Sequence, residues 1–237
     1  MKKILLRLIL VVSAIGIVYS TYFIFNYLNE YHVSAEKYEE LVRIYNQKDL
    51  KEKQKNSFQL LKQLNEDYAA WLTVEGTEIA YPVVSGEDND FYLNHNFHQE
   101  YDKVGAIFMD FRNSTDHLDF HTIIYGHNMK DGSMFGTLSH VLDSGFSKGN
   151  MITLDFGHEN YKWEIFSAYV TRETGWMEID FESTENQLLF MQDLKRKSNV
   201  NFEKEVNENN QTLTLATCTS RVSDERVVIH ARLIEED

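Results

Sequence analysis

Three side chains in this sequence have the types needed for nucleophilic chemistry, namely Cys218, His127 and Arg226. Cys218 is the one cysteine of the chain, so it cannot form an internal disulfide. A free thiol has a pKa of about 8.5 and is only slightly ionised at neutral pH, so it needs a base or a cation beside it. An imidazole supplies a base, and a guanidinium donates bidentate hydrogen bonds to an oxyanion or a carbonyl. The residue types therefore indicate a cysteine nucleophile assisted by a histidine and an arginine.

Each assignment has an alternative that the residues leave open. A lone cysteine is more often a buried structural thiol than a nucleophile. Among the nine histidines, His230 is the main rival to His127, because it alternates with Arg226 and shares a face of the last expected strand. Arg226 could instead be an ordinary surface charge, and Arg221 is the other candidate hydrogen-bond donor to the oxyanion.

No spacing identifies a carboxylate that orients His127, and the candidates are Asp110, Asp116 and Asp131. Two histidine pairs have a spacing that metal ligands use, His117 with His121 and His95 with His98. That spacing brings ligands together on a helix, whereas this region is expected to be loop and strand. We therefore expect no metal site, and nothing in the sequence indicates a cofactor.

Strands are the elements that must position these groups. The alternating run Gln211–Thr217 ends directly before Cys218, and a strand end can expose a side chain on a rigid support. Arg226 opens the run Arg226–Ile234 after a loop of seven residues. An antiparallel return across that loop places Arg226 beside Cys218.

His127 also follows a strand, His121–Tyr125, and Gly126 permits the backbone turn between them. The segment Leu72–Val84 is expected to be a hairpin that turns at Gly76, with pairing limited by Pro82, the only proline. Further strands are expected at Gly105–Asp110, Met151–Phe156 and Tyr161–Val170.

Two helices interrupt this series, one near Ser133–Leu142 and one at Thr184–Lys197. The second has Ser183 or Thr184 as its cap and an apolar stripe of Leu188, Met191 and Leu194. Seven or eight strands with few helices predict a mainly β domain in a closed or nearly closed barrel, since closure removes exposed edges.

The composition excludes several classes of protein. With 237 residues, 43% of them hydrophobic and 25% charged, the chain is neither disordered nor collagen-like. The net charge of −14 argues against nucleic acid as the main partner, because phosphate binding needs clustered Lys and Arg.

The N-terminal segment has the pattern of a membrane anchor. Lys2, Lys3 and Arg7 precede the uncharged run Leu8–Asn29, whose 22 residues span about 33 Å at about 1.5 Å per residue. The positive-inside rule places the N-terminus in the cytoplasm and the rest of the chain outside, with 20 basic against 37 acidic residues. A cleaved signal peptide is the alternative, but its apolar region is usually shorter.

The expected organisation is a cytoplasmic tip at 1–7, a transmembrane signal anchor at 8–29, a helical linker and N-terminal helices at 30–70, and the barrel at 71–237. This topology puts Cys218 in an oxidising exterior, where an exposed unpaired cysteine is at risk of oxidation unless it has a use. The location therefore favours the nucleophile over the structural thiol.

The stretch Thr212-Leu-Thr-Leu-Ala-Thr-Cys218 followed by Arg226 resembles the Thr-Leu-x-Thr-Cys signature and downstream Arg of sortases, the membrane-anchored transpeptidases of Gram-positive bacteria. The N-terminal helices and the helix expected near 184–197 resemble class B sortases in particular. The upstream segments that match are Tyr81-Pro-Val-Val, Asp88-Asn-Asp-Phe-Tyr-Leu-Asn, Gly105-Ala-Ile-Phe-Met-Asp and Tyr125-Gly-His-Asn-Met129.

The resemblance implies a role for each matching residue. Cys218 attacks a peptide bond in a C-terminal sorting signal of a secreted protein. His127 protonates the leaving amine and then deprotonates the incoming amine of a peptidoglycan precursor. Arg226 holds the substrate and stabilises the oxyanion. Residues near the substrate are Ala216, Thr217, Thr219 and Asn94.

Two positions depart from the family pattern. Ala216 stands where Ser is frequent, and Thr219 stands where some relatives have an acid. The departures leave the reaction class intact and put the sorting motif in doubt. The alternatives to a transpeptidase are a cysteine peptidase that uses water as acceptor and an anchored binding or scaffold protein with a structural cysteine.

Overall fold

The computed structural model describes residues 2–46, 51–143, 151–202, 204–207, 210–217 and 224–234. Three residues discussed above, Cys218, Thr219 and Arg221, lie outside these ranges. By its internal contacts the chain divides into two units, residues 1–40 and 41–237. The second unit holds all the strands and every residue of the candidate site.

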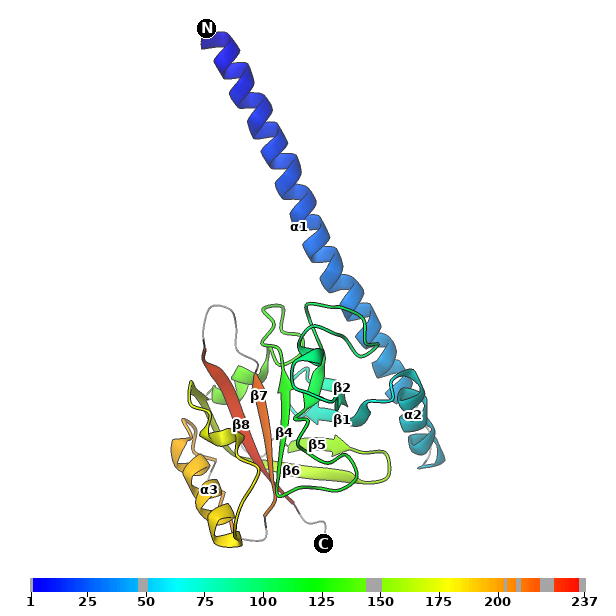
Figure 1. The fold of residues 1–237 in the computed structure, drawn as a ribbon, viewed down its shortest axis with the longest axis vertical. Helices are drawn as coiled ribbons and strands as arrows, with labels where there is room; N and C mark the ends of the chain where they lie inside the picture. The colour runs from blue at the N-terminus through cyan, green and yellow to red at the C-terminus, as the bar shows by residue number, and fades with distance from the viewer. Residues whose placement is uncertain are drawn as a thin grey trace. The chain divides into compact units, whose positions relative to one another are not determined.

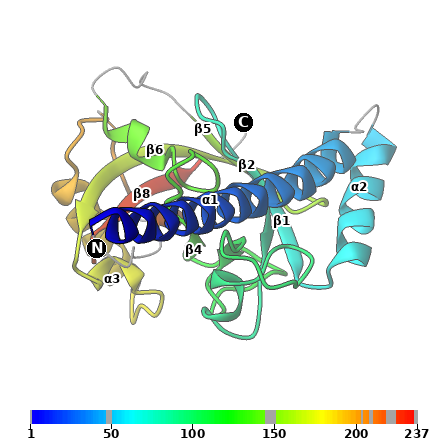
Figure 2. The same cartoon turned by 90° about the horizontal axis from the view of Figure 1, so that it is seen from above.

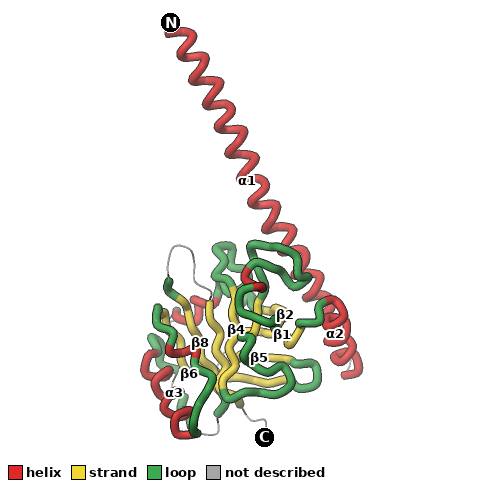
Figure 3. Tube along the Cα trace, in the orientation of Figure 1, coloured by secondary structure: helices red, strands yellow, loops and turns green. Residues whose placement is uncertain are grey.

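Eight strands close into a barrel in the order β1-β2-β3-β4-β7-β8-β6-β5, which confirms the mainly β prediction (Figures 1 and 3). The barrel interior is filled by large apolar side chains such as Leu72, Trp163 and Ile229, none of them more than 2% exposed. The strands are β1 (Tyr68–Val74), β2 (Ala80–Val84), β3 (Ile107–Met109), β4 (His121–Gly126), β5 (Met151–Asp155), β6 (Asn160–Thr171), β7 (Thr212–Thr217) and β8 (Arg226–Leu233).

The first hairpin forms as expected, but β1 begins earlier than the sequence pattern indicated. We expected helices up to residue 70 and a hairpin from Leu72, whereas β1 starts at Tyr68. The run from Tyr68 to Leu72 is buried throughout, so it has neither the alternation of a half-exposed strand nor the stripe of a surface helix. Pro82 pairs with Trp71, and the parallel ladder to β3 starts only at Val83.

Three strands at the centre of the candidate site lie side by side in Figure 1. β4 and β7 pair in parallel through six residues, from His121 opposite Thr212 to Gly126 opposite Thr217. β8 returns antiparallel to β7, with Ala216 opposite Val228, and its other edge pairs with β6, which lies beside it in Figure 2. The predicted antiparallel return that leads to Arg226 is therefore confirmed.

Three α-helices accompany the strands in the described part of the chain. α1 (Lys2–Asn46) forms the first unit up to residue 40, and its apolar part is exposed, long enough and apolar enough to cross a membrane. Within the second unit, the Tyr45 ring stacks on Trp71 at 4.1 Å between centroids and its hydroxyl donates to Asp155 at 2.9 Å. α2 (Lys51–Leu64) packs Phe58 against Gly157, where a Cβ would lie 2.7 Å from the Phe58 Cβ.

The late helix matches its prediction in both bounds. α3 (Thr184–Lys197) lies between β6 and β7 in the chain, and the Ser183 side chain accepts a hydrogen bond from the Asn186 N–H as its N-cap. Met191 and Leu194 are buried and Leu188 is half-buried, so the predicted stripe faces the protein. α3 contacts β6, and Figure 3 shows it at the side of the barrel.

The helix predicted near Ser133–Leu142 is wrong. This segment contains turns and one short 3-10 helix, η2 (Leu138–Leu142). Met134 has a φ of 51° and Gly132 a φ of 85°, which no α-helix accommodates. The apolar spacing that indicated a helix reflects burial of Met134, Phe135, Leu138 and Val141 instead.

Gly126 allows close packing at the end of β4. It has no positive φ, so the backbone freedom that we expected is not its role. A Cβ at this position would overlap the Ile107 side chain and lie 2.8 Å from the Phe135 ring. A glycine is therefore required here because the Ile107 and Phe135 side chains occupy the space that a Cβ would need.

Substitution Gly126→Ala is expected to reduce the free energy of unfolding by about 1–3 kcal/mol, the usual cost of an overpacked core. For a chain of this size that lowers Tm by about 2–4 °C per kcal/mol, measurable by circular dichroism. Gly175→Ala is the matched control, because a Cβ there meets nothing within 4 Å and Tm should hold. Equal melting of both variants would contradict this account.

Candidate active site

The β4–β7 ladder ends where two of the predicted site residues follow in the chain. Gly126 and Thr217 are the last pair of the ladder, and His127 comes directly after Gly126. Cys218 comes directly after Thr217 in the sequence, outside the described residues. Because the two strands are parallel, both leave the sheet at the same rim of the barrel.

A backbone carbonyl fixes the orientation of the His127 ring. Its Nε2 lies 2.7 Å from the carbonyl oxygen of Leu93, at the end of the short helix η1 (Phe91–Leu93). A carbonyl accepts and never donates, so Nε2 carries a proton in this arrangement. Nδ1 is consequently the ring nitrogen through which neutral His127 can accept a proton.

Gly105 packs against this hydrogen bond and was not singled out from the sequence as a site residue. Its φ is 64°, and a Cβ there would lie 2.8 Å from the Leu93 oxygen and 3.1 Å from the His127 Cδ2. Leu93 was missed as well, because it acts through its backbone and its residue type has no bearing on the contact. The one available signal was a glycine at the start of the strand expected at Gly105–Asp110.

Arg226 lies at the same rim of the barrel. It opens β8 and is half-buried, and the β7–β8 register places Val228, two residues later, opposite Ala216. The carbon at the centre of its guanidinium lies 5.9 Å from the ring centroid of Trp176. Trp176 was also missed, because 50 positions separate the two residues in the sequence.

The residues predicted to lie near a substrate have different surroundings. Ala216 is fully buried within β7, and the Thr217 hydroxyl accepts a hydrogen bond from the Val227 N–H at 2.9 Å. Asn94 is exposed and directly follows Leu93, whose carbonyl holds His127. Thr219 lies outside the described residues.

His230, the rival base, lies away from the rim and is buried on the face of the barrel wall that α3 covers, because its strand partner Ser167 donates to the Leu194 carbonyl of α3. It is fully buried, with Nδ1 2.8 Å from the Thr214 hydroxyl and Nε2 3.2 Å from the Tyr169 hydroxyl. The Thr214 hydroxyl also lies 2.6 Å from Nε2 of buried His121, whose Nδ1 is 2.6 Å from the Glu178 carbonyl. These four side chains form a continuous hydrogen-bonded chain through the core.

The Glu178 carbonyl fixes the direction of every bond in that chain. His121 Nδ1 must donate to it, so the Nε2 of neutral His121 accepts from the Thr214 hydroxyl. Thr214 then accepts from His230 Nδ1, and His230 Nε2 accepts from Tyr169. Burial lowers the pKa of His121 to about 4 and lowers the pKa of His230 well below its usual value, so both rings are neutral.

None of the three candidate carboxylates hydrogen-bonds to His127 among the described contacts. Asp110 is buried and accepts from Arg112 Nε at 2.8 Å and from the Tyr125 hydroxyl at 2.9 Å. Burial raises its pKa, but the Arg112 hydrogen bonds outweigh that effect and the net pKa is lowered. Asp131 accepts from Ser133, and the backbone N–H of Asp116 donates to Ser114.

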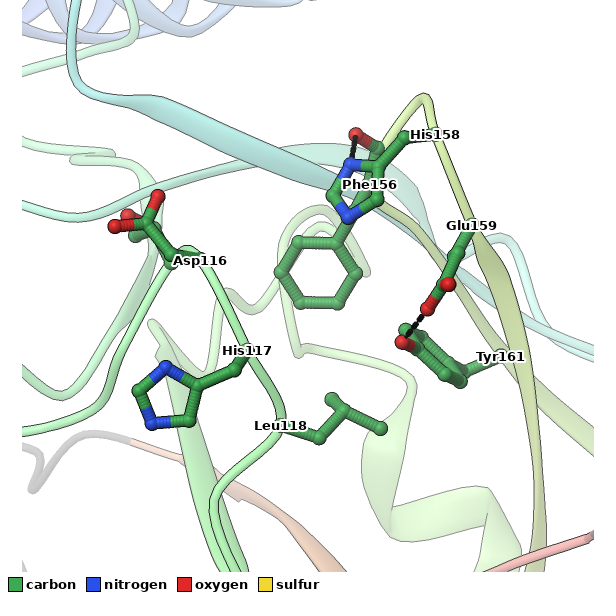
Figure 4. Close-up of a pocket in the computed structure, with 8 residues that line it drawn as sticks. Asp116, His117, Leu118, Phe156, His158, Glu159 and Tyr161 are labelled. Atoms are coloured by element: carbon green, nitrogen blue, oxygen red, sulfur yellow. Dashed lines mark hydrogen bonds between the residues drawn. The ribbon is translucent and has the colours of Figure 1, made fainter.

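A pocket of about 360 Å³ lies at the opposite rim, shown in Figure 4. His117 and Leu118 line it from the segment that leads into β4, whereas His127 follows the other end of that strand. Both ring nitrogens of His121 are engaged in the core, so His117 and His121 do not face a common ligand. Among the described residues, no group of three or more His, Cys, Asp or Glu side chains has metal-binding geometry.

Comparison with known proteins agrees with this architecture. The family model for the sortase domain matches residues 72–234. Sortase B of Listeria monocytogenes is 39% identical over 178 residues, which cover 73% of this chain and 72% of that protein. Sortase B of B. anthracis superposes with a TM-score of 0.79 at 34% identity, covering 88% of this chain and 100% of that structure. A Staphylococcus aureus sortase B–substrate complex gives 0.78 at 32% identity, with coverages of 88% and 99%.

The buried histidines predict a loss of stability in acid. An unfolded histidine has a pKa of about 6.5, so between pH 6.5 and about 4 the unfolded chain binds a proton that folded His121 excludes. Stability from His121 is therefore complete above about pH 6.5 and falls toward about pH 4, by about 2 kcal/mol at pH 5. Urea unfolding at pH 7 and pH 5 measures the difference.

The control is His121→Gln, which removes the titrating group and leaves His230 in place. Its free energy of unfolding should fall less between the two pH values than that of the parent. An identical fall in both proteins would show that His121 does not contribute.

Proposed function

Because the chain belongs to the sortase family of cysteine transpeptidases and matches its class B members, we propose that Cys218, His127 and Arg226 carry out the transfer reaction here. One observation supports this assignment above the others, namely the parallel ladder that ends at Gly126 and Thr217, directly before His127 and Cys218. The antiparallel return of β8 to its first residue, Arg226, adds the third group.

In the proposed first step, the Cys218 thiolate attacks the carbonyl carbon of a peptide bond in a sorting signal. The carbonyl oxygen becomes an oxyanion, and the Arg226 guanidinium stabilises it with N–H donors that are always charged. The C–N bond then breaks, and the leaving amine takes its proton from His127. The product is a thioester between Cys218 and the new C-terminus of the secreted protein.

In the second step the amine of a peptidoglycan precursor attacks the thioester. His127 accepts the proton of this amine, the C–S bond breaks, and Cys218 leaves as a thiolate. Water competes for the same thioester, so the acceptor must be bound beside it. The net reaction exchanges one amide bond for another and consumes neither a cofactor nor an oxidant.

The contact from His127 Nε2 to the Leu93 carbonyl supports a particular route for the protons. With Nε2 held at 2.7 Å from an acceptor, Nδ1 is the nitrogen that exchanges protons with the thiol and the two amines. A ring of fixed orientation keeps the reacting nitrogen in place through both steps, which lowers the entropic cost of each proton transfer.

The substrate contacts are proposed on position along the chain. Asn94 is exposed beside the Leu93 carbonyl, and Ala216 and Thr217 form the end of the strand that leads to Cys218. Ala216 and Thr217 are buried, so we propose that they determine the shape of the surface beneath the substrate. Thr219, directly after Cys218 in the sequence, is the proposed neighbour of the leaving group.

The proposed location is the outer face of a cell membrane. The apolar part of α1 meets the length and composition of a membrane span, and Lys2, Lys3 and Arg7 precede it. We propose residues 8–29 as the span, 1–7 in the cytoplasm, 30–70 as the connection and 71–237 as the catalytic domain outside. The proposed clients are secreted proteins that bear a C-terminal sorting signal.

The reaction is tested with a peptide that contains a sorting signal and a fluorescent label. Wild-type protein is expected to cleave it, and Cys218→Ala is expected to lose at least about 10³-fold in rate, as for the loss of a catalytic nucleophile. His117→Ala is the matched control, since His117 is exposed at the opposite rim and its loss should leave the rate unchanged.

An added oligoglycine or diaminopimelate-type amine separates transfer from hydrolysis. A ligated product, identified by mass spectrometry, is the expected result. Hydrolysis alone at saturating amine would favour the cysteine peptidase. Cleavage that survives in Cys218→Ala would contradict the assignment of the nucleophile.

A further inference from the structure

The surroundings of Arg226 differ from those of Arg112 and Arg232. Arg112 pairs with Asp110 at 2.8 Å and Arg232 with Glu164 at 2.7 Å. Among the residues that the structure describes, no carboxylate lies within ion-pair distance of Arg226, and its guanidinium lies over the face of Trp176. An aromatic face attracts a guanidinium while it leaves the N–H donors unused.

Trp176 is itself held rigidly. It lies in the short helix η3 (Gly175–Met177), is 1% exposed, and donates from Nε1 to the Glu173 carbonyl at 2.8 Å. Its ring centroid is 6.3 Å from that of Tyr125 in β4, so it packs between the barrel wall and Arg226. A buried ring with its polar atom satisfied makes a fixed platform.

Two consecutive carbonyls after Trp176 are tied to the barrel. Arg112 Nη2 donates to the Met177 carbonyl at 3.1 Å, and His121 Nδ1 donates to the Glu178 carbonyl at 2.6 Å. Arg112 is held in turn by buried Asp110, and His121 by the hydrogen-bonded chain through Thr214. The segment under Arg226 is therefore joined to the core at both residues that follow the tryptophan.

We propose that Trp176 is a positioning residue for Arg226. The indole face of Trp176 holds the Arg226 guanidinium so that the N–H donors of the arginine point to the oxyanion of the reaction. The proposal rests on the proposed function only for the identity of that oxyanion. An ion pair would fix the arginine equally well, but it would neutralise its charge and occupy its donors. The aromatic platform fixes the arginine and keeps its charge and its N–H donors available.

A first experiment tests the contact without reference to activity. The guanidinium and side-chain methylene protons of Arg226, observed by NMR on the full chain in detergent micelles, are expected to show upfield ring-current shifts. These shifts should disappear in Trp176→Leu. In Trp163→Leu, which removes another fully buried tryptophan that is not in contact with Arg226, they should persist. Unshifted Arg226 resonances in the wild type would overturn the proposal whatever the activity.

A double-mutant cycle tests the consequence for catalysis. Trp176→Leu is expected to lower kcat/KM by about 5- to 30-fold, mostly in kcat, the effect of losing a partly desolvated cation–π contact in the transition state. In an Arg226→Gln background the same substitution should change kcat/KM by less than about twofold, because the group that it positions is absent.

An equal loss in both backgrounds would show that Trp176 is only structural and would overturn the proposal. Trp176→Phe keeps an aromatic face and is expected to recover most of the lost rate, which covers the case in which the leucine variant is unstable. Ring-current shifts without any turnover of the peptide would instead refute the proposed function and leave the Arg226 contact intact.

Discussion

The parallel pairing of β4 with β7 is the constraint on which the candidate site depends. Six residue pairs join segments that are about 90 positions apart in the sequence, and the last pair is Gly126 with Thr217. In a parallel ladder both strands end at the same rim, whatever the length of the chain between them. β8 returns antiparallel to β7 and brings Arg226 to that rim. The barrel thus brings His127 and Arg226 to the rim at which β7 ends, and Cys218 is the next residue in the sequence.

The described site groups are held by contacts that leave their reactive atoms unused. His127 is held through Nε2 by the Leu93 carbonyl, and Arg226 lies over the face of Trp176. Carboxylates hold other cations of the barrel, such as Arg112 and Arg232. A carboxylate at the site would stabilise the charged imidazole and occupy the arginine donors. Carbonyl and aromatic partners set orientation with less effect on proton transfer, which suits the proposed role of His127 in both giving and accepting a proton.

Sequence patterns predicted the elements whose signals are local. The alternation in β7, the Ser183 cap of α3 and its stripe of Met191 and Leu194 depend on neighbours within a few positions, and these predictions hold. The predictions for Tyr68–Leu72 and for the segment after Ser133 were wrong. The first segment is buried throughout, and the second contains a residue with positive φ, so neither has the structure that its sequence periodicity indicated. The family motif identified Cys218, His127 and Arg226 as candidates. The register of β4, β7 and β8 then places His127 and Arg226 at the same rim of the barrel.

Other site features depend on contacts between distant segments and have no local signal. Leu93 acts through a carbonyl, Gly105 through the absence of a Cβ, and Trp176 through a ring that faces Arg226 across 50 positions of sequence. The burial of His230 under α3 follows from its pairing with Thr214 and Ser167, which alternation along one strand cannot predict. Such features need the register of the whole barrel.

A disulfide between His127→Cys and the native Cys218 is the most direct test of the arrangement. Paired positions on adjacent strands lie about 4.8 Å apart, within the range of about 4.4–6.8 Å between the Cα atoms of a disulfide. Mild oxidation of the full chain should give an intramolecular bond, seen as the loss of both titratable thiols in a monomer on a non-reducing gel. His117→Cys, at the opposite rim, should keep both thiols. Two free thiols in oxidised His127→Cys would contradict the β4–β7 register and with it the site.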